Sequence, residues 1–160
     1  MKEILFVLLL LTSLSLHAEL VTSPYAGVCV DYLPDAGQVV EKGSPLIKFD
    51  DRFKKIQIKI AELSLKEAEE MLKDKKTDIE RARTLHKRKA ISKASLEDVI
   101  YEYQITLLNI EKLRLEIDEM KMDLKDYVMR APFECKVIKR IVCKGSGTQY
   151  GTKLLEIEKL

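Results

Sequence analysis

The residues of this chain that could carry out chemistry are few, and their spacing fits no catalytic arrangement. His86 is the only histidine beyond the apolar N-terminal segment, and it falls on the seam of a predicted coiled coil. No nucleophile–base set, phosphate-binding loop or metal-ligand spacing accompanies it. Met120, Met122 and Met129 could serve a soft metal together with the cysteines, but methionine more often fills gaps in a core. We therefore expect no enzyme and no cofactor.

Three cysteines, Cys29, Cys135 and Cys143, are the remaining reactive side chains. The odd number allows at most one internal disulfide, with three possible pairings. Cys135 and Cys143 are close in the sequence and could face each other across a turn, so this pair is a possible disulfide in an oxidising compartment. Small buried thiols in a β core are an equally good interpretation of the same residues.

The first 18 residues have the pattern of a secretion signal. Lys2 gives a short positive end, Ile4 to Leu16 form an apolar run, and Ala18 offers a small residue for cleavage before Glu19. The run is short for a membrane span, which needs about 20 residues. We therefore expect an exported protein that begins at Glu19, whereas an uncleaved segment would associate it with the inner membrane.

The charge of the chain is nearly balanced, with 28 lysines and arginines against 26 aspartates and glutamates. No basic block is long enough to suggest that the protein binds nucleic acid. The length that remains after the signal allows one domain, or one small domain together with an extended element.

A segment near the start of the chain is repeated near its end, and one offset of 108 residues aligns the two copies without a gap. Each copy is predicted to form short strands because it contains β-branched runs such as Val28–Val30 and Val137–Ile138. Glycines stand where these strands must reverse, since glycine adopts positive φ at low cost. Each copy has too few apolar residues for a core of its own, so we expect the two copies to share one. The aligned pairs include Pro24 with Pro132, Gly37 with Gly145, Gly43 with Gly151 and Asp50 with Glu158.

Between the copies, the sequence predicts two long helices that pack as an antiparallel coiled coil. Apolar residues follow alternating steps of three and four along both segments, which is the heptad pattern of a helix–helix seam. The pattern breaks near Lys89 to Ala94, and Ser95 with Asp98 resembles a capping box at the start of the second helix. Each arm has roughly 32 to 38 residues, which is about 50 Å of helix. The seam residues are Ile58, Ala61, Leu65, Ala68, Leu72, Lys75, Ile79, Ala82 and His86 in the first helix, and Leu96, Val99, Tyr103, Thr106, Ile110, Leu113, Ile117, Met120, Leu124 and Tyr127 in the second.

The predicted fold class is therefore α+β. A long coiled-coil α-hairpin, residues 51–129 with its tip near 88–95, is inserted between two halves of one β module, residues 19–50 and 130–160. The strands of both halves must reunite for this fold to form, so the inserted hairpin must leave the module and return to it at one place.

Five apolar residues occupy heptad position f, which points away from the seam, in the half of the hairpin nearer the β module. At the turn end the same position carries polar residues such as Glu70, Thr77 and Thr84. Apolar residues opposite a seam usually need a partner, so we expect neighbouring hairpins to pack sideways in a ring. Scattered surface aliphatics are the alternative interpretation. The five residues of this predicted lateral oligomer contact are Ile56, Leu63, Leu108, Leu115 and Met122.

Around the turn, Arg81 is followed by Leu85 after four residues and by Ser92 after a further seven. This spacing resembles the tip motif of the periplasmic adaptor proteins, also called membrane fusion proteins (HlyD-like), of Gram-negative tripartite efflux pumps and type I secretion systems. Ala131–Glu134 resembles the opening of the second lipoyl half-motif in that family, and Ser23–Val28 resembles the first. The resemblance covers essentially the whole chain beyond the signal.

The resemblance implies a flattened lipoyl-like β module, and hairpins that assemble into a hollow barrel that is typically sixfold. Arg81, Leu85 and Ser92 would then contact the periplasmic tip of a TolC-like outer-membrane channel, and the protein would bridge this channel to an inner-membrane transporter. The residues alone also allow Leu85 in the core, Ser92 as a helix cap and Arg81 as a solvated charge. The chain would in that case be a periplasmic coiled-coil binding or chaperone-like protein without a transport role.

The chain departs from the family pattern in two respects. It ends at Leu160, directly after the second half-motif, where β-barrel and membrane-proximal domains usually follow, so the contact with a transporter is unclear and a separate chain could supply these domains. Cys135 stands where the family usually has glycine. Lipoyl carriers present a modified lysine at the hairpin that links the two halves, but here the helical insert replaces that hairpin and Lys48 falls in a strand. No swinging-arm cofactor is therefore expected.

Overall fold

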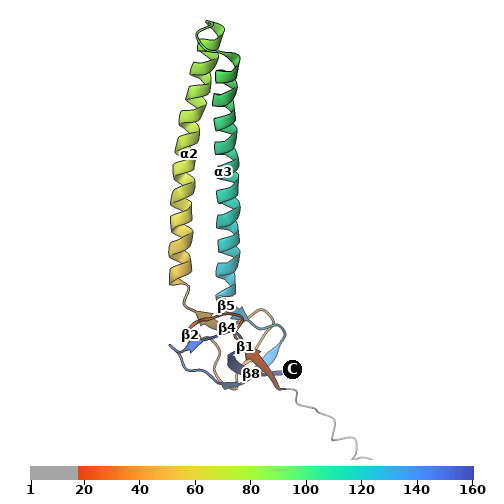
Figure 1. Cartoon of the computed structure of the whole chain (residues 1–160). Helices are drawn as coiled ribbons and strands as arrows, with labels where there is room; N and C mark the ends of the chain where they lie inside the picture. Colours follow the sequence, from red (N-terminus) through yellow and green to blue (C-terminus); the bar gives the residue numbers. More distant parts are fainter. Residues whose placement is uncertain (1–17) are drawn as a thin grey trace, which may run out of the picture. The chain divides into compact units, whose positions relative to one another are not determined.

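The computed structural model describes residues 18–160, so the predicted signal peptide lies, apart from Ala18, outside the described residues. The described chain divides into two compact units. One is a β module built from both ends of this range, and the other is a helical hairpin, Asp51–Asp126 (Figure 1). The expected α+β class, with a hairpin inserted into a β module, is confirmed.

The β module consists of two four-stranded sheets, and each sheet combines strands from both copies of the repeat. The strands are β1 (Ala18–Thr22), β2 (Gly27–Tyr32), β3 (Val39–Val40), β4 (Pro45–Phe49), β5 (Val128–Arg130), β6 (Cys135–Arg140), β7 (Gly147–Thr148) and β8 (Lys153–Lys159). One sheet has the order β1-β8-β6-β3 and the other the order β5-β4-β2-β7, with antiparallel pairing throughout. Because β3 pairs with β6 and β2 with β7, neither copy of the repeat forms a sheet alone.

The two copies exchange equivalent backbone hydrogen bonds across the module. The amide of Gly37 donates to the carbonyl of Val137 over 2.6 Å, and the amide of Gly145 donates to the carbonyl of Cys29 over 2.7 Å. Gly37 and Gly145 have φ of +90° and +84°, a region that residues with a Cβ rarely adopt. The glycines at the strand reversals therefore act as the sequence predicts, and the same bond is made twice.

Both copies contribute to one hydrophobic core. Phe49 lies at its centre, and its ring packs against the ring of Tyr25 with 5.0 Å between the centroids. Full burial of such side chains contributes roughly 1.5–3 kcal/mol each, and this contribution requires both copies. The residues with no exposed surface are Cys29, Leu46, Ile47, Phe49, Cys135, Val137, Leu154, Leu155 and Ile157.

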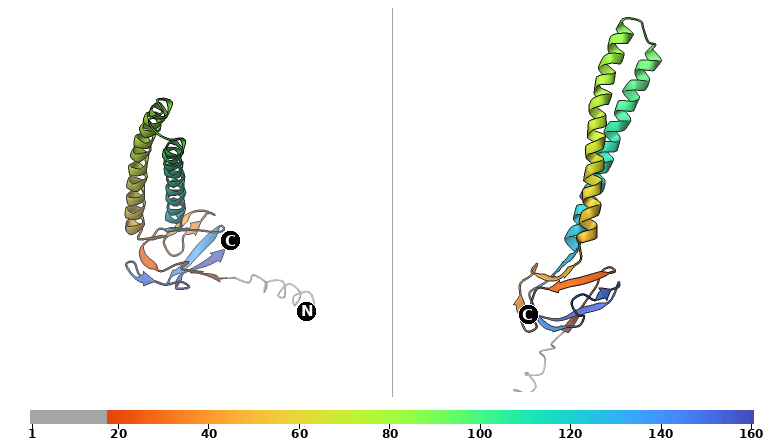
Figure 2. Two further views of the ribbon diagram at one scale, coloured as in Figure 1. Left: turned by 45° about the horizontal axis from the view of Figure 1, so that its top comes forward. Right: turned by 90° about the vertical axis from the view of Figure 1, so that its left-hand side faces the viewer.

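The hairpin consists of α2 (Arg52–Lys87) and α3 (Lys93–Asp126), which lie side by side in both views of Figure 2. The predicted seam residues within the two helices are all buried or half-buried, and the isoleucines Ile58, Ile79, Ile110 and Ile117 are the most deeply buried of the large ones. Tyr127, predicted as the last seam residue, instead lies beyond α3 in the β module. The predicted coiled-coil seam is thus present over the full length of both helices.

The return to the β module comes slightly earlier than position 130. The hairpin unit ends at Asp126, and β5 begins at Val128 and pairs with β4. The amide of Phe49 donates to the carbonyl of Tyr127 over 2.8 Å. Tyr127, Val128 and Met129 are apolar, so they fit the end of a heptad pattern as well as a short strand, and the pairing with β4 decides between the two.

All three cysteines are free thiols in the structure. Cys135 opens β6 and is fully buried, whereas Cys143 is exposed in the loop that follows this strand. The possible disulfide between Cys135 and Cys143 is therefore not formed, because one thiol points into the core and the other lies at the surface. The interpretation as buried thiols fits Cys29 and Cys135.

Candidate functional site

A short turn, residues 88–92, joins the two helices, and hydrogen bonds fix its backbone. Lys89 adopts a positive φ of 59°, and the amide of Ala90 donates to the carbonyl of Leu85 over 2.9 Å, which closes α2. Oγ of Ser92 accepts the amide of Ser95 over 3.0 Å and so caps α3. The capping-box pattern had suggested Ser95 as the N-cap of α3. The N-cap is instead Ser92, because it stands directly before the first helical residue and its hydroxyl accepts the Ser95 amide.

His86 has a structural place at the same turn. Its ring is half-buried, and Nδ1 lies 3.2 Å from the carbonyl oxygen of Ile91 on the other side of the turn. This contact ties the end of α2 to the chain entering α3, and no acid or nucleophile accompanies the imidazole among its hydrogen-bond partners in the described chain.

Arg81 and Leu85 lie together on the surface of α2 near the turn. They line one shallow groove of about 430 Å³ with Glu80 and Thr84. Leu85 is 41% exposed, so it is not part of the seam core. The guanidinium of Arg81 approaches Asp78 at 3.4 Å, but it remains largely exposed, and such surface pairs contribute little. The groove therefore presents an apolar side chain beside a fork of hydrogen-bond donors.

Ser92 does not line this groove. Its hydroxyl is 2.9 Å from Oγ of Ser95, in addition to the bond that it accepts from the backbone. The structure thus brings together two of the three predicted tip residues and gives the third a capping role, as the alternative interpretation of the sequence expected.

A Ser92→Ala variant is expected to lower the stability of the hairpin by about 1 kcal/mol, because alanine cannot accept the first free amides of α3. Ser92→Asp should retain the stability, since aspartate caps equally well. Thermal unfolding followed by circular dichroism at the helical band measures both. Ser64→Ala, inside α2, is the control and should not lower stability, because alanine favours a helix interior; an unchanged melting curve for Ser92→Ala would contradict the capping role.

The five residues of the predicted lateral contact are all exposed. Their exposed fractions range from 57% for Ile56 to 65% for Leu115, so they face away from the seam as position f requires. Phe53 and Ile60, at the neighbouring position c of α2, are also exposed, at 71% and 59%. We call Phe53, Ile56, Ile60 and Leu63 the α2 stripe, and Leu108, Leu115 and Met122 the α3 stripe.

Sequence reasoning missed Phe53 and Ile60, although their signal was present. Phe53, Ile56, Ile60 and Leu63 follow steps of three and four, which is the spacing of a second helical face. On α3, Tyr101 and Ile105 likewise extend the apolar surface toward the turn, at 63% and 46% exposure.

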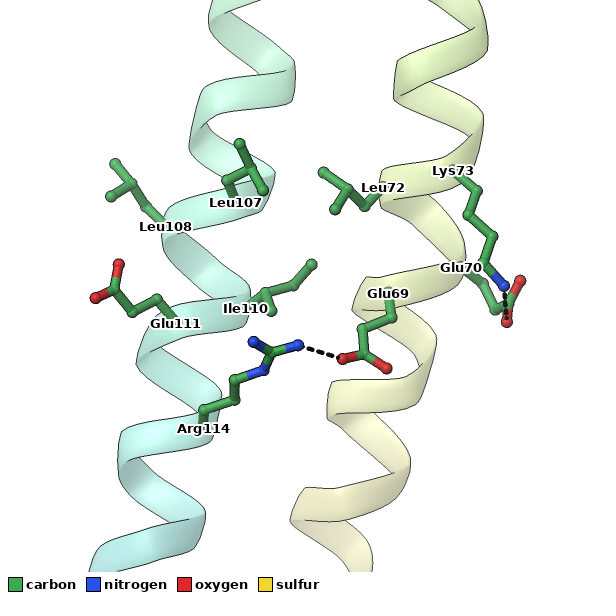
Figure 3. Close-up of a pocket in the computed structure, with 9 residues that line it drawn as sticks. All are labelled: Glu69, Glu70, Leu72, Lys73, Leu107, Leu108, Ile110, Glu111 and Arg114. Carbon is green, nitrogen blue, oxygen red and sulfur yellow. Dashed lines mark hydrogen bonds and ion pairs between the residues drawn. The ribbon is translucent and has the colours of Figure 1, made fainter.

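Near the middle of the hairpin, a groove of about 760 Å³ runs between the helices on one face. Figure 3 shows Leu107 on the side of α3 that faces α2, whereas Leu108 and Glu111 point away from α2. Arg114 donates to Glu69 over 2.8 Å across the groove. The outward direction of Leu108 and Glu111 places them on the free edge of the hairpin.

Ion pairs at several heights join the helices across the seam and define their antiparallel register. Each contains an exposed side chain, so each contributes at most about 1 kcal/mol, but together they fix which residues lie at the same height. The pairs are Lys54–Asp123 at 2.7 Å, Glu62–Lys121 at 2.8 Å, Glu69–Arg114 at 2.8 Å, and Lys75–Glu102.

The titratable groups inside the β module are held in their neutral forms. Burial raises the pKa of the Cys29 thiol and of the Cys135 thiol, and it raises the pKa of Tyr32 to about 12. A thiol with a raised pKa is a poor nucleophile at neutral pH. These cysteines therefore behave as small core residues.

No family model matches the chain, and no curated protein matches it in sequence. Solved structures do match its fold. MacA from Actinobacillus actinomycetemcomitans matches with a TM-score of 0.76 and 20% identity, over 90% of this chain and 49% of MacA. The membrane fusion protein Spr0693 from Streptococcus pneumoniae R6 matches with a TM-score of 0.65 and 14% identity, over 89% of this chain and 59% of that protein. A putative efflux transporter from Bacteroides eggerthii DSM 20697 matches with a TM-score of 0.60 and 20% identity, over 90% and 40%.

The chain therefore has the fold of the membrane fusion, or periplasmic adaptor, proteins, as the tip spacing and the split repeat led us to expect. It spans less than half of the length of MacA and of the Bacteroides protein. The soluble domain of LipC, a membrane fusion protein of a type I secretion system, has the same fold over 99% of its length, with a TM-score of 0.59 and 10% identity.

Neither α2 nor α3 resembles a transmembrane helix, and no helix within residues 18–160 is both long and apolar enough to cross a bilayer. In the same part of the chain, histidine, cysteine and acidic side chains nowhere gather in threes as a metal site would require.

Proposed function

We propose that this protein is an exported periplasmic adaptor subunit of a tripartite efflux or secretion system, where it helps to connect an inner-membrane transporter to a TolC-like outer-membrane channel. The observation that carries the proposal is a split β module whose inserted hairpin exposes Arg81 and Leu85 in one groove at its turn. Solved structures with this fold include membrane fusion proteins. Such a protein works by shape and assembly, without a reaction of its own.

The groove at the turn has the chemistry that a helical channel tip would need. Leu85 can fill a small apolar notch, and Arg81 offers a planar fork of donors to carbonyl groups at a loop end. Ser92 contributes by its small size, since its hydroxyl is already engaged in the cap. In this proposal Arg81 and Leu85 carry the docking contact, and Ser92 permits close approach.

The end of the hairpin is strongly basic. Lys87, Arg88, Lys89 and Lys93 are all exposed at or beside the turn. A positive end steers the protein toward an acidic partner surface, and the rate of association then falls as salt is added. The cations at the end of α2 also interact favourably with the negative, C-terminal end of the helix dipole and so stabilise the helix. This stabilising role is compatible with the steering role.

The α2 and α3 stripes would bring neighbouring copies together around the conduit. The position-f residues Ile56, Leu63, Leu108, Leu115 and Met122 form the centre of this lateral contact. A homo-oligomeric ring, typically of six copies in the family that the chain resembles, would cover these exposed apolar side chains.

The docking proposal is tested by a Leu85→Asp variant in cells that express a TolC-like channel. A photo-crosslinking amino acid at Thr84, which lines the same groove, reports the contact. Docking would bury the new carboxylate against an apolar surface, which costs several kcal/mol. We therefore expect the crosslink to the channel to fall at least about tenfold.

Thr77→Asp is the matched control, because Thr77 is exposed on the same helix and does not line the groove. It should leave the crosslink unchanged, and both variants should keep the helical circular dichroism of the parent. An undiminished crosslink in Leu85→Asp, with export of cargo retained, would overturn the proposed docking.

A further inference from the structure

The two broad sides of the hairpin carry different heptad positions. Ile58 of α2 and Ile110 of α3 stand at position a, and counting from them assigns every other position. The groove in Figure 3 is lined by Lys73 and Glu111 at position b and by Glu69 at position e, so these positions of both helices share one side. We call this side the e/b face, and we call the opposite side, with positions g and c of both helices, the g/c face.

The e/b face has more bases than acids, and the g/c face has more acids than bases. Within α2 and α3 the bases of the g/c face are Arg81 and Lys112, and each is paired with an acid of the same helix. Lys54 and Lys75, at seam positions, pair with two further acids of this face, so the face remains acidic overall. The acids of the g/c face that make no hydrogen bond or ion pair within residues 18–160 are Glu67, Asp74, Asp98 and Glu119.

The apolar residues that flank position f lie on the g/c side of it. Phe53 and Ile60 of α2 and Ile105 of α3 occupy position c, at 71%, 59% and 46% exposure. Position b, on the other side of f, carries no apolar residue in either helix. The shift is strongest in α2, and in α3 it rests on Ile105, since the other c positions of that helix are charged. The apolar edge of the hairpin is thus centred between f and c.

This shift distinguishes the inner face of a ring from its outer face. In a closed ring of helices, the two neighbours of one helix are not diametrically opposite, because the ring curves toward its axis. The contact with the next copy is therefore displaced from the point opposite the seam, toward the face that lines the interior. Apolar residues at c and not at b match a ring that encloses the g/c face.

We infer that the g/c face of the hairpin lines the interior of the conduit, whose acidic wall favours cationic over anionic cargo. A space lined by one sign of charge concentrates ions of the opposite sign, and a ring repeats the unpaired acids of the g/c face in every copy. The basic e/b face lies on the outside. The inference rests on the ring proposed above, and it adds which face is enclosed and the charge class of what passes.

Cysteines on the two faces test which of them is enclosed. Ser64→Cys at position g and Lys66→Cys at position b are two residues apart on α2, so they lie at nearly the same height on opposite faces. Both positions are exposed, and both variants also carry Cys143→Ser, which removes the exposed native thiol. The full-length variants are exported in cells that express the TolC-like channel, and the outer membrane is permeabilised. A maleimide on a bulky polyethylene glycol should label Lys66→Cys and spare Ser64→Cys, whereas a small maleimide should label both.

Charged reagents at the same cysteines test the sign of the enclosed wall. A cationic and an anionic methanethiosulfonate of similar size are compared at each position, and the ratio of their rates at Lys66→Cys serves as the reference. At low salt the ratio at Ser64→Cys should favour the cation at least about tenfold more than the reference does, and added salt should reduce this preference. Equal ratios at the two positions would overturn the acidic wall.

Neutral substitutions test which acids are responsible. Glu67→Gln together with Asp74→Asn should lower the preference for the cation at Ser64→Cys, because both carboxylates lie on the g/c face of α2. Glu111→Gln together with Asp118→Asn, on the e/b face of α3, is the matched control and should not lower it.

The labelling pattern separates a wrong face from a wrong ring. Protection of Lys66→Cys in place of Ser64→Cys would overturn the inferred face and leave the ring in place. Labelling of both cysteines by the bulky reagent would mean that neither face is enclosed, and it would contradict the ring as well. The crosslink at Thr84 reports tip docking independently of these results.

Discussion

A Phe49→Ala variant is expected to lose about 3–5 kcal/mol of the free energy of unfolding of the β module. Phe49 has no exposed surface and packs against Tyr25 in the core that both repeat copies build. Alanine removes the ring and leaves a cavity between two sheets, which rigid strands cannot close fully. Because native domains are stable by only about 5–15 kcal/mol, this loss should leave a substantial part of the module unfolded at physiological temperature.

The measurement must separate the module from the hairpin, because the two compact units need not unfold together. The chain has no tryptophan, so the near-ultraviolet circular dichroism of Tyr25 and Tyr127, which pack at 5.3 Å between ring centroids, reports the module. Phe53→Ala is the matched control, since Phe53 is 71% exposed on α2 and should change the stability of the single chain by no more than about 0.5 kcal/mol. Equal effects of the two substitutions would contradict the placement of the core.

The three thiols are expected to differ in alkylation rate by about 100-fold or more. Cys143 is exposed and should react at once, whereas Cys29 and Cys135 are fully buried and react only when the module opens. Burial also raises the pKa of these two thiols, so they hold little reactive thiolate while the module is closed. Alkylation with iodoacetamide, followed by mass spectrometry of the peptides, measures the three rates.

Cys143→Ser should remove the fast phase and leave the two slow rates unchanged. Phe49→Ala should accelerate the slow phase, because it increases the population of the open module. Protection of Cys143 against alkylation under reducing conditions, or rapid reaction of Cys135 in the parent chain, would contradict the burial pattern on which both expectations rest.

The features that the sequence predicted are those with a long-range period. The repeat at a constant offset indicated a shared core because neither copy could fill one, and Leu46, Phe49, Leu154 and Ile157 are indeed buried together. The heptads located the seam because alternating steps of three and four admit only one buried face over such a length. The heptad pattern extends over many residues, so a single charged residue at a seam position, such as Lys75, did not obscure the prediction of the seam.

The features that the sequence could not settle depend on one local contact each. Ser92 and Ser95 are both good N-caps, and only the bond from the Ser95 amide to the Ser92 hydroxyl distinguishes them. The pairing of Cys135 with Cys143 depended on which way two side chains point. The exposure of Leu85 excluded a place in the seam core, which the sequence alone could not do, because a position next to the seam is compatible with a buried or an exposed side chain.

The interleaving of the two repeat copies dictates an order of events during synthesis. β1 pairs with β8, with Ala18 opposite Glu158, so the first strand waits unpaired until almost the last residue has been made. The helices α2 and α3 lie between these strands in the sequence and pack only on each other. They can therefore form the hairpin as soon as both have been synthesised. β2 and β4 can pair early, but β1 and β3 remain open, aggregation-prone edges until β8 and β6 are available. The short length of β3 and β7 limits how much such an edge can offer to a wrong partner.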